Sequence, residues 1–334
     1  MAKTKPNIYD VADAAGVSHQ TVSRVLNNHP SLRPETRQRV EVAMMNLGYI
    51  PNRAARALVT SRSKLIGILV SDATLFGPAG MLHAIEVEAR KSGYVPFAYS
   101  VDPNSADDIN AGIAHLRELG VDGVILIVPQ TLPIDVARAG LPNTPIVTVD
   151  SDQHSKLFAV HSDNYGGARL ATQHLIDLGH RRILHITGNL SWTVGRERQR
   201  GYEDCMRAAG LAPLTAEGDW QINTGYAIAS EYDFSGITGI VCGNDHTALG
   251  VLRALGERGI NVPGDISMVG FDDIPEAAFF SPPLTTVRQD FFAIGKLAIN
   301  SLLGQLEQGE PMVSELIGLQ LIIRKSTAQV RNSR

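Results

Sequence analysis

The 334-residue sequence is poor in cysteine and aromatic residues, and it lacks a long apolar run. Its two cysteines, Cys205 and Cys242, are too few for a disulfide framework or a four-cysteine metal site. No apolar run approaches the roughly 20 residues that span a bilayer, and the first ten residues lack an apolar stretch of signal-peptide length. We therefore expect a cytoplasmic protein with no membrane segment, no metal and no cofactor.

The motifs of three large enzyme classes are absent as well. The sequence has no G-x-x-x-x-G-K-[ST] phosphate loop, no G-x-G-x-x-G after an apolar strand and no G-x-S-x-G nucleophile elbow. Asp272 and Asp273 could imitate a catalytic carboxylate pair, but neighbours on an extended strand point to opposite sides. We expect no enzymatic activity, and a sugar-converting α/β enzyme stays as the weaker alternative.

Charge is unevenly distributed along the chain. Residues 1–62 hold nine Lys and Arg against four Asp and Glu, a surplus of five positive charges. Because the whole chain carries a net charge of −4, the remainder carries −9. A small basic segment ahead of an acidic body indicates that the basic segment binds nucleic-acid phosphates. The alternative is a solvated basic surface, which would have the same charge surplus.

The start of the chain has the pattern of two short helices joined by a glycine turn. Asn7 can cap the first helix, with Asp10 at its third position. Gly16 suits a left-handed turn, and Ser18 can cap a second helix over about 19–26. Two helices joined in this way form a helix-turn-helix.

The second of these helices has a polar outward face, formed by His19, Gln20, Ser23 and Arg24. In a helix-turn-helix, the N-terminal residues of the second helix enter the major groove. Gln can form two hydrogen bonds with adenine, Arg can form two with guanine, and Ser hydroxyls can reach phosphates. The face therefore predicts direct base contacts by residues 19, 20 and 24, with an ordinary exposed helix face as the alternative.

Two further segments complete the N-terminal region. A third helix is expected from Pro34 to the glycine at position 48. Residues 52–59 are alanine-rich, contain Arg53 and Arg56, and are too short for a stable isolated helix. We expect this segment to order only against a partner, such as its twin in a dimer or a DNA groove, with a plain linker as the alternative.

From Lys64 onward, apolar runs alternate with amphipathic helical patterns. The runs "KLIGILVS", "DGVILIVP" and "PIVTVD" are continuous rather than alternating, which indicates a parallel sheet buried on both faces. The scheme starts again after Asp150 with "FAVHSD". The pattern predicts a small all-α helix-turn-helix headpiece followed by an α/β body of two lobes with parallel sheets.

Polar side chains collect where the predicted strands of the body end. Ligands of such sheets bind beyond the carboxyl ends of the strands. Carboxylates and amides can hydrogen-bond the hydroxyls of a sugar, and an indole can stack on its apolar face. Singly, each residue is explained as well by a helix cap, a surface charge or the core, but together they predict a ligand site. They are Ser71, Asp150, Arg198, Trp220, Asn244, Asp272 and Gln289.

The segments "IYDVADAAGVSHQTVSRVLN" and "TRQRVEVAMMNLGYIPNRAARAL", together with the two-lobed body, resemble the LacI/GalR family of bacterial repressors. The resemblance covers nearly the whole chain, from about Asn7 to about Lys325. It implies a repressor that binds double-stranded operator DNA, and a periplasmic-binding-protein-like body whose chain crosses between the lobes three times. The implied divisions are a headpiece at 1–50, a hinge helix and linker at 51–62, an effector-binding and dimerisation body at 63–334, an N-lobe of about 63–160 plus 290–325, and a C-lobe of about 161–289.

The resemblance also implies roles for individual residues. The recognition helix would lie within Ser18–Asn27, which adds Ser18, Thr21 and Asn27 to the DNA-contacting set. Two paired hinge helices would enter the minor groove through Asn52, Arg53, Ala55 and the apolar wedge Leu58.

For the effector site, the resemblance places Leu75, Phe76 and Pro78 in a loop that lines the aglycone side of a ligand. It favours a galactoside or related glycoside as inducer of a homodimer. A purine or other ligand acting on the same fold is the alternative.

Overall fold

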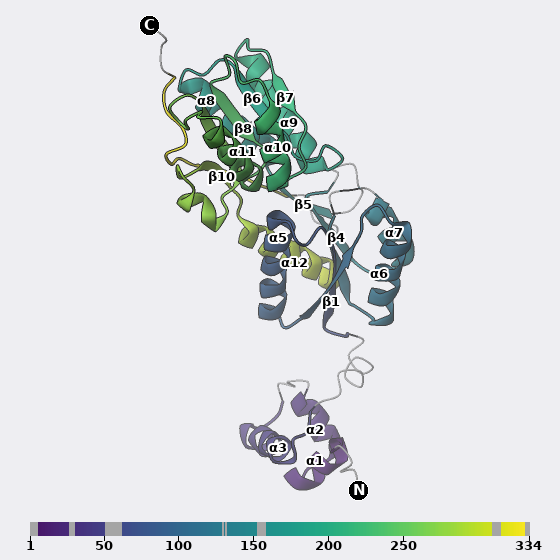
Figure 1. Cartoon of the computed structure of the whole chain (residues 1–334). Helices are drawn as coiled ribbons and strands as arrows, with labels where there is room; N and C mark the ends of the chain where they lie inside the picture. Colours follow the sequence, from purple (N-terminus) through teal and green to yellow (C-terminus); the bar gives the residue numbers. More distant parts are fainter. Residues whose placement is uncertain are drawn as a thin grey trace. The chain divides into compact units, whose positions relative to one another are not determined.

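The computed structural model describes residues 6–26, 31–50, 62–128, 130, 132–151, 158–308 and 315–330. The chain divides into two compact units, Met1–Ser63 and Lys64–Arg334 (Figure 1). Five predicted DNA-contacting residues lie outside the described residues, and so does the expected hinge helix: Asn27, Asn52, Arg53, Ala55 and Leu58. Within the described ranges, no helix is long and apolar enough to cross a membrane.

The first unit contains three helices, α1 (Ile8–Ala15), α2 (His19–Leu26) and α3 (Pro34–Leu47). The side chain of Asn7 accepts hydrogen bonds at the start of α1, and the Asp10 carboxylate accepts one from the Asn7 backbone, as the capping-box pattern predicts. Gly16 ends α1 at φ 62°, a left-handed conformation that costs glycine little. Small apolar residues form the shared core: Val11, Ala12, Ala15, Val22, Val25, Val40 and Ala43.

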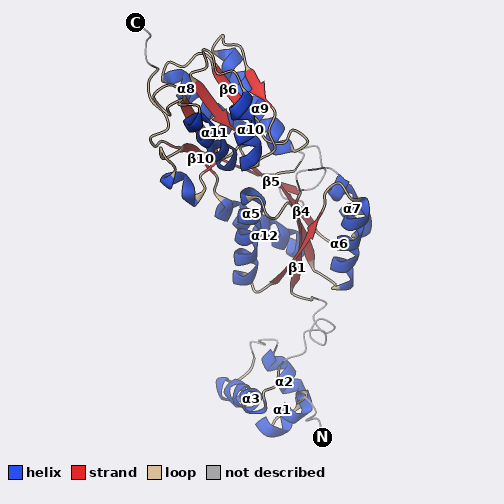
Figure 2. Ribbon diagram, viewed as in Figure 1, coloured by secondary structure: helices blue, strands red, loops and turns tan. Residues whose placement is uncertain are grey.

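The first lobe of the body is a six-stranded parallel sheet covered by helices on both faces (Figure 2). Helices α5 and α12 pack on one face and α6 and α7 on the other, each pair with its own apolar cluster. The strand order is β11-β5-β4-β3-β1-β2. The elements are β1 (Leu65–Ser71), α5 (Phe76–Lys91), β2 (Val95–Val101), α6 (Ala106–Glu118), β3 (Gly123–Ile127), α7 (Leu132–Gly140), β4 (Ile146–Val149), β5 (Phe158–Ser162), α12 (Phe291–Gln308) and β11 (Glu315–Ile317).

The second lobe repeats this architecture with strand order β12-β10-β9-β8-β6-β7, and only β12 runs antiparallel to its neighbour. Helices α8 and α9 pack on one face and α10 and α11 on the other. The elements are α8 (Asn164–Asp177), β6 (Ile183–Ile186), α9 (Thr193–Ala208), β7 (Leu214–Ala216), α10 (Ile222–Glu231), β8 (Gly239–Cys242), α11 (Asp245–Glu257), β9 (Ser267–Asp272), the 3-10 helix η1 (Pro275–Phe279), β10 (Thr285–Arg288) and β12 (Gln320–Ile322).

The chain passes between the two sheets three times: after β5, between β10 and α12, and between β11 and β12. One strand lies in a different lobe from the one expected. β5, which stands at the expected lobe boundary near residue 160, pairs with β4 and β11 in the first sheet. β12 lies within 290–325, which we expected in the first lobe, but it pairs with β10 in the second. Both strands belong to crossing segments, whose apolar residues fit either sheet, so only the pairing assigns them.

Candidate functional site

The start of α2 carries the polar face predicted to contact DNA. His19, Gln20 and Arg24 are exposed, whereas Val22 and Val25 face the core of the first unit. The helix therefore separates a buried apolar face from an exposed face rich in hydrogen-bonding groups.

Local contacts hold this end of α2 in place. The Thr21 backbone N–H donates to Ser18 Oγ at 3.2 Å, and the two hydroxyl groups lie 3.0 Å apart. Ser18 thus caps the helix, as predicted from its position after the glycine turn. The His19 ring lies 5.2 Å from the Tyr9 ring of α1, while Thr21 and Ser23 are half-buried.

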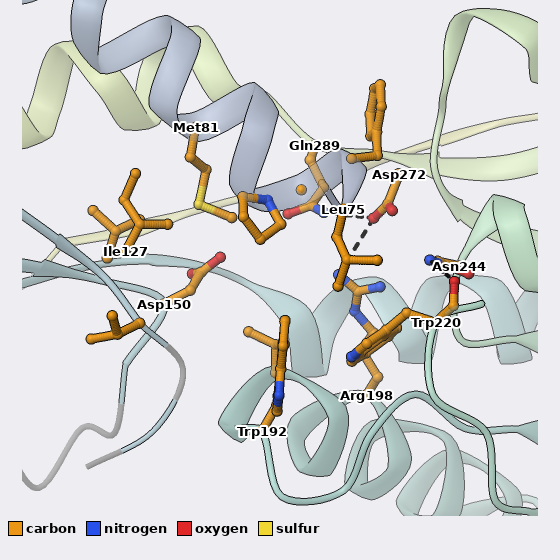
Figure 3. Close-up of a pocket in the computed structure, with 16 residues that line it drawn as sticks. Leu75, Met81, Ile127, Asp150, Trp192, Arg198, Trp220, Asn244, Asp272 and Gln289 are labelled. Carbon is orange, nitrogen blue, oxygen red and sulfur yellow. Dashed lines mark hydrogen bonds and ion pairs between the residues drawn. The ribbon is translucent and has the colours of Figure 1, made fainter. Parts of the chain in front are cut away.

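The body contains a cavity, the inner cavity, at the carboxyl ends of strands from both sheets (Figure 3). It encloses about 560 Å³ of space not occupied by atoms, part of it open to solvent. Nine predicted ligand residues line it: Leu75, Phe76, Pro78, Asp150, Arg198, Trp220, Asn244, Asp272 and Gln289. The tenth, Ser71 at the end of β1, does not line it and is fully buried.

Arg198 is the cation of the inner cavity, and its residue is only 5% exposed. Its Nε donates to Asn164 Oδ1 at 2.8 Å, and one terminal nitrogen donates to the Gly243 carbonyl at 2.6 Å. The other terminal nitrogen lies 3.5 Å from Asp272 Oδ1. The guanidinium carbon lies 3.6 Å from the centre of the Phe271 ring. These contacts use the planar geometry of the group, so its orientation is fixed before any ligand binds.

Asp272, which faces Arg198, also meets Gln289. Gln289 Nε2 donates to Asp272 Oδ1 at 2.7 Å, and Gln289 Oε1 is buried with no partner among the described residues. Burial raises the pKa of Asp272, while Arg198 and the Gln289 hydrogen bond oppose that rise. The pair presents hydrogen-bonding oxygens to the inner cavity.

Asp150 brings a carboxylate from the first lobe. Its two oxygens accept hydrogen bonds from the Ser162 backbone at 2.7 Å and the Ser162 hydroxyl at 3.2 Å. Burial raises the pKa of Asp150 to about 6, although these hydrogen bonds and the charge of Arg198 oppose it. A ligand donor would favour the ionised form of this carboxylate.

Two indoles form an aromatic wall of the inner cavity. The ring centres of Trp192 and Trp220 lie 5.8 Å apart at 49°. Asn244 Nδ2 donates to the Trp220 carbonyl at 3.1 Å, which ties this wall to the start of α11. A Cβ atom at Gly188 would overlap the Trp220 ring, so glycine at the end of β6 makes room for the indole.

Three residues of the inner cavity have a left-handed backbone: Asp150 at φ 50°, Trp220 at φ 76° and Asp272 at φ 109°. Such conformations are costly for residues other than glycine, and they concentrate at functional sites. Each turns the chain sharply at or near the end of a strand, which directs its side chain into the space between the lobes.

The sequence-based prediction missed seven lining residues: Gly77, Met81, Ile127, Val128, Val149, Trp192 and Val194. Six are glycine or aliphatic residues, whose sequence pattern is that of an ordinary core. Trp192 could have been found, because it follows the end of β6 just as the predicted polar residues follow other strands.

The inner cavity has the side chains of a binding site for a small molecule. Among the described residues, its lining holds no Ser, Cys, His or Lys. The same part of the chain holds no cluster of His, Cys, Asp and Glu suited to a metal. Buried carboxylates, amides, a guanidinium and indoles suit a polar, uncharged small molecule with an apolar face.

Both units match known families. Residues 7–52 match the lacI family of bacterial regulatory proteins, and residues 172–327 match the periplasmic binding protein-like domain. The lactose operon repressor of Escherichia coli (strain K12) is 35% identical over 325 residues, covering 96% of this chain and 90% of that protein. The HTH-type transcriptional repressor PurR of Haemophilus influenzae (strain PittEE) is 32% identical, covering 97% of this chain and 99% of that protein.

A solved structure has the same fold over nearly the whole chain. The crystal structure of the lac repressor dimer bound to operator and the anti-inducer ONPF superposes with a TM-score of 0.89 at 32% identity, covering 97% of this chain and all of that one. The two relatives of this chain named above are transcriptional repressors rather than enzymes. The chain therefore belongs to the lacI family of bacterial regulatory proteins and is a DNA-binding transcriptional repressor.

Proposed function

We propose that this repressor binds its operator as a homodimer and that a sugar, a galactoside or related glycoside, releases it from DNA by binding in the inner cavity. The observation that carries the sugar assignment is the combination of buried carboxylates with an aromatic wall. Asp150 and Asp272 accept hydrogen bonds from hydroxyls, and Trp220 offers a flat apolar surface to the ring. The lactose operon repressor, at 35% identity, supports the same class of effector.

On the DNA side, the exposed face of α2 supports base contacts by Gln20 and Arg24. One headpiece reads one half-site, so a two-fold dimer requires a nearly palindromic operator. The related structure of a lac repressor dimer on operator supports this assembly. In this proposal, the hinge residues Asn52, Arg53, Ala55 and Leu58 pair in the minor groove between the half-sites.

Control of DNA binding follows from where the inner cavity lies. Asp150 follows β4 of the first lobe, whereas Arg198 and Asp272 belong to the second. A ligand held by all three favours one arrangement of the lobes. If that arrangement separates the two hinges, the ligand lowers operator affinity, and operator DNA lowers ligand affinity by the same factor.

A purine is the second candidate effector, because PurR relatives match 97% of this chain and an indole can also stack on a purine. The carboxylates favour a sugar instead. Two buried acceptors, Asp150 and Asp272, suit a ligand with many hydroxyl donors, and a purine offers few.

The test is a thermal-shift screen of the full chain with mono- and disaccharides and with guanine and hypoxanthine, repeated with a DNA fragment that the protein selects from a random pool. We expect a galactoside to raise the melting temperature and to release the DNA. Asp272→Asn should keep DNA binding and lose this release, whereas the exposed carboxyl variant Asp233→Asn should keep both. A shift with purines alone would overturn the sugar assignment, and equal binding of random and selected DNA would contradict the operator-binding assignment.

A further inference from the structure

Asp245 is a fully buried carboxylate that does not line the inner cavity. It is the first residue of α11, and the cap formed by Asn244 fixes the start of that helix. Asn244 Oδ1 accepts a hydrogen bond from the Thr247 backbone at 2.8 Å. A carboxylate is costly to bury unless its oxygens accept hydrogen bonds, so the partners of Asp245 indicate what it holds together.

The two oxygens of Asp245 connect three segments of the second lobe. Oδ1 accepts a hydrogen bond from the Thr286 hydroxyl on β10 at 2.6 Å, and Oδ2 accepts one from the Ile274 backbone N–H at 2.9 Å. Ile274 lies two residues after Asp272, the last residue of β9. A Cβ atom at Gly270 of β9 would overlap Asp245 Oδ1, so the glycine leaves room for the carboxylate. Asp245 therefore ties α11 to β10 and to the turn after β9.

The turn after β9 depends on contacts of this kind. Asp272 and Asp273 both have left-handed backbones, at φ 109° and φ 56°. Such residues are strained and persist only where the surrounding structure holds them. Asp273 forms ion pairs of 2.6 Å with Arg288 and with Arg324, and Asp245 holds the next backbone N–H. Between β9 and these two anchors, the Asp272 side chain is directed into the inner cavity (Figure 3).

The hydrogen bonds of Asp245, rather than its charge, suit it to hold this turn. Burial, and then the nearby Asp272 carboxylate, raise the pKa of Asp245 well above its ordinary value, so a negative charge is disfavoured there. Asparagine has the same shape. Its carbonyl oxygen can accept from the Ile274 N–H, and its amide can donate to the Thr286 hydroxyl oxygen. Asparagine at position 245 should therefore keep both connections, and alanine should keep neither.

We propose that Asp245 is a positioning residue for the effector site: through Ile274 and Thr286 it holds the turn that directs the Asp272 carboxylate into the inner cavity. The inference rests on the proposed sugar effector, because it takes Asp272 as the acceptor for a ligand hydroxyl. Effector affinity then depends on a carboxylate that does not itself touch the effector.

Crystal structures of the full chain without ligand test the positioning directly. In Asp245→Ala, Asp272 should leave its left-handed conformation and lose its hydrogen bond from Gln289. In Asp245→Asn, both features should be kept. Thr286→Val, which removes only one of the two donors, provides a milder variant should the alanine protein fail to fold. An unchanged Asp272 in the alanine variant, or in the valine variant where only that one folds, would overturn the inference whether or not a sugar binds.

Calorimetry with methyl β-galactoside tests the consequence for the effector. Asp245→Ala should weaken binding about tenfold and Thr286→Val severalfold, whereas Asp245→Asn should bind like the parent. Thr247→Val is the matched control, because the Thr247 hydroxyl is also buried but has no partner among the described residues. Equal affinities of the two valine variants would overturn the inference. If the parent does not bind this glycoside, the galactoside assignment fails, and the crystal structures still decide the positioning.

Monodeoxy analogues of the same glycoside separate positioning from a general loss of packing. Each analogue lacks one hydroxyl, and Asp272→Ala identifies the hydroxyl that Asp272 accepts, because its removal should no longer weaken binding in that variant. Thr286→Val should reduce the cost of removing this same hydroxyl and leave the cost of removing the others unchanged. Weakening of all analogues by one common factor would show that Asp245 supports only the fold, and would overturn the inference.

Discussion

Arg198 on α9 and Asp272 at the end of β9 form a buried ion pair, with 3.5 Å between the guanidinium nitrogen and the carboxylate oxygen. The separation is long for a charge-assisted hydrogen bond. Two other donors of Arg198 are held at 2.8 Å and 2.6 Å by Asn164 and Gly243, which restrains the guanidinium from turning toward the acid. A ligand hydroxyl can therefore bond to Asp272 without first breaking a strong pair.

Arg198→Lys should destabilise the body and abolish effector binding. An ammonium cannot reach Asn164, Gly243 and Asp272 together, and each lost charged hydrogen bond leaves a buried partner, so we expect a loss of about 2–3 kcal/mol in unfolding free energy. Urea denaturation and calorimetry measure the two effects. Arg207→Lys, an exposed change on the same helix, is the control and should alter neither. An unchanged affinity in the Arg198 variant would contradict this role.

Arg24→Ala should abolish sequence-specific DNA binding while ligand binding stays intact. A guanine contact through two hydrogen bonds discriminates by about 1–3 kcal/mol, so selected and random DNA should become nearly equal in a gel-shift titration. Arg39→Ala removes the same charge from an exposed position on α3. This control should weaken binding to both DNAs alike, and a loss of discrimination there would show that charge alone is responsible.

Gly188→Ala should disrupt the aromatic wall. The added methyl group would overlap the Trp220 ring, which is confined by Trp192 and Arg198, so we expect a lower melting temperature and weaker sugar binding. Gly256→Ala on α11 is the matched control. Its Cβ meets no atom within 4 Å, and alanine in a helix is favoured over glycine by about 0.5–1 kcal/mol. The control should be slightly stabilised, and equal melting temperatures for the two variants would refute the packing argument.

Asp150→Asn should become more stable relative to the parent as pH rises. Burial raises the pKa of Asp150 from 3.8 to about 6, so the folded parent binds more protons than the unfolded chain and loses stability between about pH 4 and 6. The asparagine does not titrate. The pKa of Glu197 is raised to about 7 by burial and then by Asp150. Its titration extends the pH range over which the parent loses stability to about pH 7.

The measurement is the difference in unfolding free energy between Asp150→Asn and the parent from pH 4 to 7. Because both proteins share the other titrating groups, the difference isolates Asp150 and its coupling to Glu197. A difference that stays constant over this range would contradict a raised pKa at Asp150.

The sequence by itself determined the elements that depend on local chemistry. The Asn7 cap, the Gly16 turn and the apolar spacing of Val22 and Val25 specify the helix-turn-helix without reference to distant residues, because capping and periodicity act within one or two turns. The continuous apolar runs determined parallel strands buried on both faces. Residues at or after their ends predicted six of the sixteen residues that line the inner cavity, because all parallel strands end at the same edge of a sheet.

Only the tertiary structure decided what depends on pairing and on packing. β12 lies in the second lobe rather than the first because a short crossing strand satisfies its hydrogen bonds at whichever sheet edge it reaches. Ser71 does not line the inner cavity, although it stands at a strand end like the residues that do. Most of the aliphatic lining was not predicted, since it arises where residues distant in the chain meet across the two lobes.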